Sequence, residues 1–378
     1  MLRESLGDIM ARLGDYVKIR TGKLDANAAS EKGQYPFFTC SVEPLKIDTY
    51  SYDCECVLVA GNGDLNVKYY NGKFDAYQRT YIIESIDKSV LSVPYLYCFL
   101  NKYVETLRKQ AIGGVIKYIK LGNLTEAQIP LCSLGEQEKI VNILNKVNKV
   151  IATRKQQLQQ LDELVKARFV EMFGDPVANP MKWDMPLIED VVANEKNALK
   201  AGPFGSALKK EYYVSSGYKI YGQEQVISGD HTFGDYYIDE ERYKLLENCA
   251  VQAGDVLISL VGTYGKLLIM PEKFEPGIIN PRLMKITFDK KKVNPFYFQH
   301  YFQSDSLKKA LAENTHGGTM DILNLGIVRK LVMPLPPIEL QNQFVTFVEQ
   351  VDKSKFAVQK ALDEAQTLFD SLMQEYFG

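Results

Sequence analysis

Two short clusters of side chains in this sequence are suited to hydrogen bonding with the edges of nucleic-acid bases. Gln78-Arg79 lies in the first quarter of the chain, and Gln223-Glu224-Gln225 lies in the second half. A glutamine amide can form two parallel hydrogen bonds with adenine, and an arginine guanidinium can form two with guanine. The chemistry that these residue types offer is therefore recognition of bases.

Cationic, aromatic and hydroxyl side chains accompany these clusters, several of them beside glycine-containing turns. Glycine lets a backbone approach a phosphate or a base closely, and phosphate contacts position a protein on DNA without reading its sequence. For any single residue, a solvated surface charge or a structural turn is an equally good interpretation. The candidates for DNA contact are Lys23, Lys68, Lys73, Tyr77, Gln78, Arg79, Lys209, Lys210, Gln223, Gln225, Thr263, Tyr264, Lys266 and Arg282.

Residue patterns of catalytic, cofactor and metal sites are missing. The segment 262–266 superficially resembles a phosphate-binding loop, but Leu267 stands where serine or threonine is needed. Asn280-Pro281 continues to arginine instead of the proline and aromatic residue of a DNA-methyltransferase motif. Cys54-Glu55-Cys56 has no second cysteine pair, and the three histidines are scattered. We therefore expect no catalytic residues, no metal and no cofactor.

The composition favours a multidomain protein of the cytoplasm. The chain has 378 residues, 46% of them hydrophobic, and no apolar run long enough for a membrane span or a signal peptide. Its six cysteines are irregularly spaced, which favours reduced thiols. The net charge of −2 arises mainly in residues 337–378, so the two large blocks are close to neutral. Any DNA affinity must come from local patches or from partner subunits.

The chain contains an internal repeat with an offset of 204 residues. Between residues 113 and 141, eight of 29 positions are identical to residues 317–345, including Gln137 and Gln341. The upstream parts match more loosely, and Cys56-Val57-Leu58-Val59 resembles Asp255-Val256-Leu257-Ile258. A unit of this length indicates a duplicated domain and not a solenoid. The two copies match well at their helical ends and diverge in the parts before them, as expected of two domains that share a fold and bind different targets. A duplication without functional meaning would look the same.

Two long helices are predicted, one after each copy. Residues 136–173 contain no proline or glycine before Gly174-Asp175-Pro176, and an apolar seven-residue periodicity runs through them and through the chain's last 40 residues. We expect the two helices to pack together in antiparallel orientation, although each could instead pack on its own domain. The seam residues are Leu144, Ile151, Leu158, Leu161, Val165, Met172, Val348, Val351, Val358, Leu362, Phe369 and Leu372.

Other residues interrupt or flank this seam. Arg154 and Lys355 fall on it, where a charge must reach solvent along its aliphatic stem. Further apolar positions lie beside the seam and indicate either a second face for another subunit or a wide core stripe. These are Ile143, Val150, Phe169, Phe347 and Phe356.

Each copy predicts short strands followed by a helix, the pattern of an α+β fold. In the first copy we expect strands at 35–40, 56–60 and 79–84 and a helix at 94–110. In the second copy we expect strands at 218–221, 256–261, 266–270 and 283–288 and a helix at 295–313.

Four segments carry a resemblance to a known family. Residues 202–209, 254–266 and 334–341 look like the target recognition domain of type I restriction-modification specificity subunits, and Phe173-Gly174-Asp175-Pro176 resembles the end of that family's central helix. The similarity covers essentially the whole chain, although Gly61-Asn62-Gly63-Asp64 in the first copy is less typical.

The resemblance implies an architecture and a set of partners. Two similar recognition domains, residues 1–133 and 177–336, would be joined and spaced with pseudo-two-fold symmetry by long antiparallel coiled-coil helices in residues 134–176 and 337–378. Each domain would read half of a bipartite, asymmetric site in double-stranded DNA, with half-sites about 10 bp apart. Partners would be two methyltransferase subunits and the restriction (motor-nuclease) subunits. The alternatives are a coiled-coil scaffold that binds only proteins, a solitary DNA reader and a catalytic enzyme.

Overall fold

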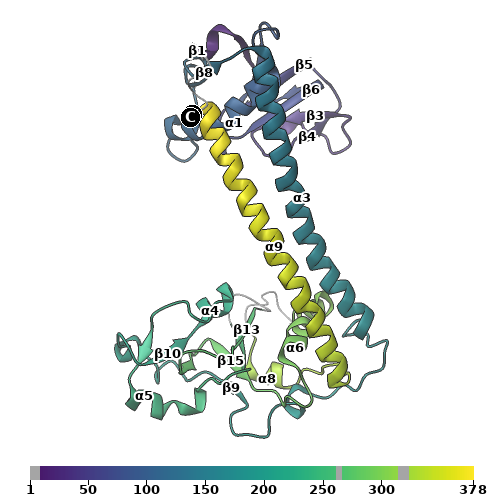
Figure 1. Cartoon of the computed structure of the whole chain (residues 1–378), viewed down its shortest axis with the longest axis vertical. Coiled ribbons are helices and arrows are strands. Elements are labelled where there is room, and N and C mark those ends of the chain that lie inside the picture. The colour runs from purple at the N-terminus through teal and green to yellow at the C-terminus, as the bar shows by residue number, and fades with distance from the viewer. Residues whose placement is uncertain (1–8, 261–265, 314–322) are drawn as a thin grey trace. The chain divides into compact units, whose positions relative to one another are not determined.

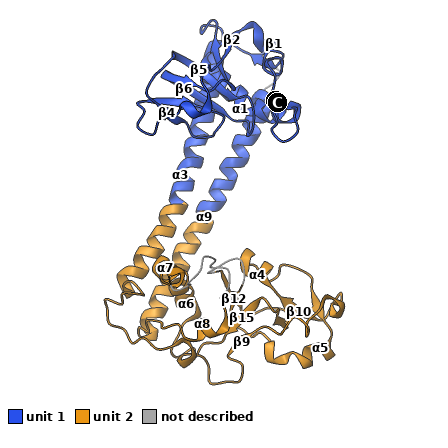
Figure 2. Ribbon diagram, turned by 180° about the vertical axis from the view of Figure 1, so that it is seen from behind, with its two compact units in different colours: residues 1–157, 358–378 blue, residues 158–357 orange. Residues whose placement is uncertain are grey.

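The computed structural model describes residues 9–260, 266–313 and 323–378, which fall into two compact units (Figure 1). Unit 1 comprises residues 1–157 and 358–378, and unit 2 comprises residues 158–357. Helix α3 (Leu134–Phe173) and helix α9 (Ile338–Phe377) each contribute one end to each unit (Figure 2). The units therefore divide the helices, whereas the sequence boundaries had given each helix a segment of its own.

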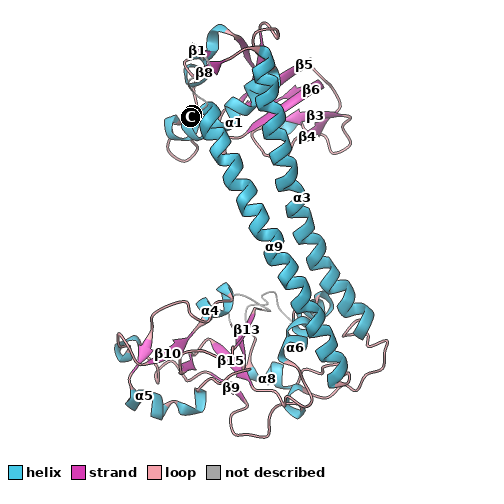
Figure 3. Cartoon of the chain, viewed as in Figure 1, coloured by secondary structure: helices cyan, strands magenta, loops and turns pink. Residues whose placement is uncertain are grey.

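Unit 1 is built on one mixed sheet. Among the described residues, its strands lie in the order β2, β7, β5, β6, β3, β4, and only the β3–β6 pair is parallel. A separate antiparallel pair, β1–β8, closes the unit next to α3. The strands are β1 (Ile9–Arg12), β2 (Val17–Thr21), β3 (Tyr35–Phe38), β4 (Leu45–Ile47), β5 (Tyr52–Ala60), β6 (Val67–Ala76), β7 (Thr80–Ser85) and β8 (Gln128–Leu131). The remaining α-helices of unit 1 among the described residues are α1 (Val93–Gln110) and α2 (Leu121–Thr125). Figure 3 shows helices in cyan and strands in magenta.

Unit 2 divides its strands between two small sheets. Among the described residues, one sheet has the order β13, β12, β15, β9 and the other has the order β11, β10, β14. The strands are β9 (Leu199–Ala201), β10 (Tyr218–Tyr221), β11 (Tyr237–Ile238), β12 (Val256–Ser259), β13 (Leu267–Ile269), β14 (Gly277–Ile279) and β15 (Leu283–Ile286). The additional helices are α4 (Gln223–Ser228), α5 (Glu240–Leu245), α6 (Pro295–Phe302), α7 (Asp305–Glu313) and α8 (Leu325–Arg329).

The two units share a strand order, which confirms the duplication. The antiparallel order β2-β7-β5-β6 in unit 1 corresponds to β9-β15-β12-β13 in unit 2. Val57 pairs with Ile83 in the first sheet, and Val256 pairs with Ile286 in the second. This register matches the sequence similarity between residues 56–59 and 255–258. The long strand β6 of unit 1 is replaced in unit 2 by β13 and β14, and β14 pairs in parallel with β10 as β6 does with β3.

The two long helices enter the core of each unit by opposite ends. In unit 1, Ile140 and Leu144 of α3 share the core with Met373 of α9. In unit 2, Phe169 of α3 shares the core with Phe344 of α9, and their ring centroids are 5.4 Å apart. Because early α3 meets late α9 in one unit and the reverse holds in the other, the helices run antiparallel within each unit, as predicted. All twelve seam residues are buried or half-buried.

The interruptions of the seam are accommodated locally. Lys355 Nζ lies 2.7 Å from Asp162 Oδ1, and Arg154 donates to Gln157 Oε1 at 2.8 Å. Of the flanking apolar residues, Phe169 is buried in the core, whereas Phe356 is 75% exposed.

Most predicted elements are present, but one predicted helix is divided and several observed strands were not predicted. The helix expected over 295–313 is wrong as a single element, because α6 ends at Phe302 and α7 begins at Asp305. Strand β6 was not predicted, because its sequence VKYYNGKFDA carries polar residues and a glycine. The predicted strands begin or end within a few residues of the expected positions, whereas strands β1, β2, β4, β8, β9, β11 and β14 were also not predicted.

Candidate nucleic-acid interface

The predicted cluster Gln78-Arg79 lies on the tight turn that joins β6 to β7. Gln78 and Arg79 are both exposed, whereas the flanking Ala76 and Thr80 are buried. The turn closes on itself through a hydrogen bond from Thr80 N to Tyr77 O at 2.8 Å. The buried strand ends on both sides fix the backbone of the turn, and the turn presents two polar side chains to solvent.

Two glycines hold this turn from opposite sides. Gly22 N donates to Thr80 O at 3.0 Å, and Gly61 N donates to Arg79 O at 2.8 Å. A Cβ at Gly22 would lie 2.1 Å from Ala76 O, and a Cβ at Gly61 would lie 2.4 Å from Arg79 O. These glycines therefore permit backbone to approach backbone. Glycine-containing turns were predicted to allow close approach of a nucleic acid, and at these two positions they allow close approach of the chain's own backbone.

Unit 2 contains the same arrangement around Arg282. Gly202 N donates to Leu283 O at 2.8 Å, and Leu260 N donates to Arg282 O at 2.9 Å. A Cβ at Gly202 would lie 1.9 Å from Asn280 O. Gly202 and Leu260 are thus the counterparts of Gly22 and Gly61, and Arg282 occupies the position of Arg79. The two arginines were separate candidates in the sequence, and the structure shows that they are equivalent.

The side chains around these two arginines differ. Arg282 Nη1 lies 3.3 Å from Gln223 Oε1, and Gln223 Nε2 donates to Ser259 Oγ at 2.8 Å. In unit 1 the strand register places Cys40 where unit 2 has Gln223. Cys40 Sγ lies 2.9 Å from Asn62 Oδ1 and 3.7 Å from Arg79 O. One backbone frame therefore carries two different sets of hydrogen-bonding groups.

The structure brings several of the other unit 1 candidates to this turn. Lys23 is exposed on the segment that pairs with the turn, where Gln78 N donates to Leu24 O at 2.9 Å. Lys68 is half-buried and bonds Asn66, whose amide donates to Cys40 O at 2.8 Å. Burial lowers the pKa of the Lys68 ammonium.

The last two candidates of unit 1 differ in their positions, one on the turn and one away from it. Tyr77 is half-buried and forms a bridge with Leu24, so it shares the turn with Gln78. Lys73 is exposed, and its Nζ lies 4.6 Å from the centre of the Tyr50 ring. A cation at that distance is attracted by the ring face. Lys73 therefore has a local partner away from the turn.

Gln225 does not belong to the exposed surface of unit 2. Its side chain is 1% exposed, its Oε1 accepts from Gly222 N at 2.8 Å, and its Nε2 donates to Phe233 O at 2.6 Å. The prediction of a base contact by Gln225 is therefore wrong, because both ends of its amide are already used to hold the chain around α4.

The remaining candidates of unit 2 are exposed or lie outside the described residues. Lys209 pairs with Glu211 at 3.4 Å, and Lys210 is exposed beside it. Lys266 O accepts from Ser259 N at 3.4 Å, which places Lys266 next to the residue that Gln223 contacts. Thr263 and Tyr264 lie in the segment 261–265, outside the described residues.

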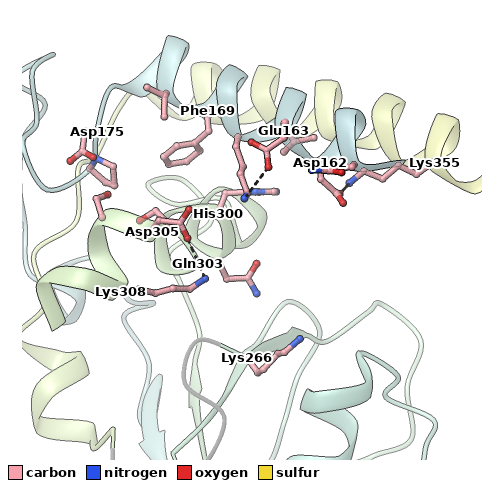
Figure 4. Close-up of a pocket in the computed structure, with 17 residues that line it drawn as sticks. Asp162, Glu163, Phe169, Asp175, Lys266, His300, Gln303, Asp305, Lys308 and Lys355 are labelled. Atoms are coloured by element: carbon pink, nitrogen blue, oxygen red, sulfur yellow. Dashed lines mark hydrogen bonds and ion pairs between the residues drawn. The ribbon is translucent and has the colours of Figure 1, made fainter. Parts of the chain in front are cut away.

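Lys266 also lines a hollow of about 710 Å³ within unit 2 (Figure 4). Lysines and carboxylates alternate around it, as in the pairs Lys308–Asp305 at 3.9 Å and Lys355–Asp162 at 2.7 Å. Mixed charge of this kind selects no single class of ligand. In the described parts of the chain, no group of three or more His, Cys, Asp or Glu residues could hold a metal ion. No described helix is long and apolar enough to cross a bilayer.

Sequence reasoning missed three features of the unit 1 surface. Cys40 and Asn62 lie beside Arg79, but only the strand register relates Cys40 to Gln223. A short hairpin, Ile112–Tyr118, is bonded to the segment that holds the turn, through Gly63 N and Lys117 O at 2.9 Å. It lies at the start of the repeat found in the sequence, but nothing in the sequence showed that Val115 projects into solvent.

Comparison with known proteins identifies similar chains. The family model described as "Type I restriction modification DNA specificity domain" matches residues 10–163 and 185–365. The type I restriction enzyme EcoDI specificity subunit of Escherichia coli is 40% identical over 154 residues, which cover 41% of this chain and 34% of that subunit. This match thus spans about a third of the EcoDI subunit's length.

Longer but weaker similarities extend over the whole chain. The type I restriction enzyme MjaVIII specificity subunit of Methanocaldococcus jannaschii is 21% identical over 396 residues, covering 95% of this chain and 91% of that one. The crystal structure of a type I restriction-modification S subunit from M. genitalium aligns with a TM-score of 0.59 at 16% identity. That alignment covers 100% of this chain and 98% of the other, and at this identity it indicates a shared fold.

Proposed function

This chain belongs to the type I restriction modification DNA specificity domain family, and we propose that its two units read the two halves of a bipartite DNA target. The chain would be the non-catalytic specificity subunit of a type I restriction-modification enzyme and would act in the cytoplasm. It would position two methyltransferase subunits and the restriction subunits on double-stranded DNA. The similarity of the chain to type I restriction enzyme specificity subunits supports this assignment.

One observation supports two-part reading more than any other. Arg79 and Arg282 occupy equivalent turns, and a glycine holds each turn through a backbone hydrogen bond. A Cβ added at either glycine would lie about 2 Å from a backbone oxygen of the turn. An arginine on a rigid turn can form two hydrogen bonds with the O6 and N7 atoms of guanine. The neighbouring groups differ, Cys40 and Asn62 in unit 1 against Gln223 and Ser259 in unit 2. We therefore propose that the half-sites differ in sequence.

Exposed lysines of both units would contact phosphates. Lys23 in unit 1 and Lys209 and Lys210 in unit 2 are exposed, and such contacts position a protein without reading bases. Because the chain as a whole carries a net charge of −2, its affinity for DNA phosphates should be modest without cationic partner subunits.

The long helices would act as the spacer. Each has 40 residues, which corresponds to about 60 Å at about 1.5 Å per residue. Each helix enters the core of both units, and we propose that this continuity sets the distance between the two readers. The expected separation of the half-sites is about one turn of B-DNA, roughly 34 Å.

Reconstitution would test the assignment. The chain would be co-expressed with the methyltransferase subunit of its own restriction-modification system, and the complex would be purified and incubated with DNA and a methyl donor. We expect the methyltransferase subunit to co-purify with the chain and to methylate DNA only in its presence. A chain that binds neither the methyltransferase subunit nor DNA would instead support the protein-scaffold alternative.

A further inference from the structure

A small hairpin in unit 1 projects apolar side chains into solvent beside the Arg79 turn. Ile112 and Tyr118 exchange two backbone hydrogen bonds, of 3.0 and 2.9 Å, and so close a loop over residues 113–117. Val115 at its tip is 103% exposed, and Ile116 is 62% exposed. Exposure of these two adjacent β-branched side chains has no stabilising role within the folded chain, because removing apolar surface from water is what stabilises such side chains.

The hairpin is tied to the backbone that holds Arg79. Gly63 N donates to Lys117 O at 2.9 Å, and Ile119 N donates to Gly61 O at 2.9 Å. Gly61 in turn donates to Arg79 O at 2.8 Å. Ile119 and Arg79 also line the same hollow. Each of these links is a direct hydrogen bond or a step of two residues, and two residues span at most about 7 Å. The tip and the arginine are therefore within about 20 Å of one another, the length of about six base pairs of DNA.

The charge around the tip favours a nucleic acid as its partner. Lys117 and Lys120 are exposed on either side of Ile119, and neither forms an ion pair with any described residue. A protein partner for an apolar tip would be expected to bring apolar surface, whereas two unpaired lysines beside it attract phosphates. The turn that carries the tip requires glycine at its start, because Gly113 has φ +122° and a Cβ there would lie 2.5 Å from Ile116 O.

We infer that Val115 and Ile116 are specificity-determining residues that pack against thymine methyl groups in the half-site read by unit 1. The C5-methyl group of thymine is the apolar feature that the major groove presents, and apolar side chains recognise it by contact. Arg79 would read a guanine by hydrogen bonds in the same groove, and the hairpin would add contacts that distinguish A·T pairs. This inference rests on the proposed DNA-reading function of unit 1.

Replacing thymine by uracil removes the methyl group and leaves base pairing intact. Binding of the full chain in its methyltransferase complex would be measured on two duplexes, with thymine or uracil in the unit 1 half-site. Wild-type protein should bind the uracil duplex roughly fourfold more weakly for each methyl group contacted, the factor that corresponds to burying one methylene-sized group. The double variant V115A/I116A should bind both duplexes equally.

Controls separate this inference from the proposed function. Ile86→Ala removes an apolar side chain that is 64% exposed and follows the far end of β7, and it should retain the thymine preference. Uracil in the unit 2 half-site should affect V115A/I116A as it affects the wild type. If V115A/I116A kept the wild-type preference for the thymine duplex, the methyl contact would be overturned. The same conclusion would follow if the wild-type protein bound the two duplexes equally. If Arg79→Ala also left binding unchanged, the proposed reading by unit 1 would itself fail.

Discussion

Gln137 and Gln341 are buried at equivalent positions in the two units and form equivalent hydrogen bonds. Gln137 Oε1 accepts from Ser92 N at 2.9 Å, and its Nε2 donates to Val90 O at 2.7 Å and Cys132 O at 3.0 Å. Gln341 Oε1 accepts from Asn294 N at 2.9 Å, and its Nε2 donates to Lys292 O at 2.9 Å and Pro336 O at 2.8 Å. Each glutamine thereby fixes the start of its long helix to the loop before α1 or α6.

Substitution of either glutamine by alanine should destabilise its unit. Both side chains are 0% exposed, and removal of the amide leaves three backbone groups, most of them partly buried, without their partner. We expect Q137A and Q341A each to lower the free energy of unfolding by about 2–4 kcal/mol. Chemical denaturation measures this loss. Gln160→Ala, on an exposed position of α3, should change stability by less than about 0.5 kcal/mol, and equal effects of all three variants would contradict the assigned role.

Arg79→Ala and Arg282→Ala should each weaken recognition of a different half-site. Loss of a bidentate arginine–guanine contact costs about 1–3 kcal/mol, which corresponds to roughly a 5- to 150-fold loss of affinity. Because both side chains are exposed, folding should be unaffected. Competition binding with base changes in one half-site at a time measures the effect. R79A should become insensitive to changes in one half only, and R282A to changes in the other; a loss shared by both halves would argue against separate readers.

Gly202→Ala should impair DNA binding more than folding. The added Cβ would lie 1.9 Å from Asn280 O, so the turn that carries Arg282 must shift. Gly205 provides a matched control in the same loop, because nothing lies within 4 Å of a Cβ built there. We expect weak binding to the unit 2 half-site for G202A and near wild-type binding for G205A. Wild-type binding by G202A, measured in the same titration, would show that the position of this turn is unimportant.

His300 should make the stability of unit 2 dependent on pH. Burial lowers its pKa to about 4, assisted by the nearby Lys355 and opposed by Asp352. Since the imidazole is neutral in the folded protein and has a pKa near 6.5 when unfolded, its protonation favours unfolding. The contribution to stability is complete above about pH 6.5 and decreases as the pH falls towards 4, by up to about 3 kcal/mol.

The variant His300→Gln tests this dependence. Its urea midpoint for unit 2 should change less than that of the wild type between pH 7 and pH 5, because no group then titrates at this position. The carboxylates of the chain contribute equally to the pH dependence of both proteins, so their effect cancels in the comparison. Parallel pH profiles for wild type and H300Q would show that His300 is already accessible to protonation in the folded state.

The sequence predicted the parts of this fold that depend on periodicity. The heptad pattern identified α3 and α9, and the run Cys56–Ala60 identified the end of a buried strand. The similarity of residues 56–59 to 255–258 was correct in register even though Cys56 of unit 1 stands where unit 2 has Asp255. Asp255 is buried and lies 3.0 Å from Lys285 Nζ, so unit 2 carries an ion pair where unit 1 has apolar side chains. A difference of this kind hides a shared fold from sequence comparison.

The candidate interface was less accessible to sequence reasoning. Gln225 was selected for its residue type, but its burial depends on the fold of the loop after α4. The equivalence of Arg79 and Arg282 depends on hydrogen bonds from residues distant in the chain, Gly61 and Leu260, which no local pattern reveals. Residue type thus identified the arginines as candidates, and tertiary contacts were needed to select them from the other charged residues.

We propose that two unlike readers in one chain recognise two separate half-sites. Sequencing of methylated bases in cells that carry the methyltransferase subunit, with and without this chain, tests it most directly. We expect methylation at a target with two different short half-sites, separated by a fixed number of unread base pairs and absent without the chain. A continuous or palindromic target, or methylation that does not require the chain, would contradict the account.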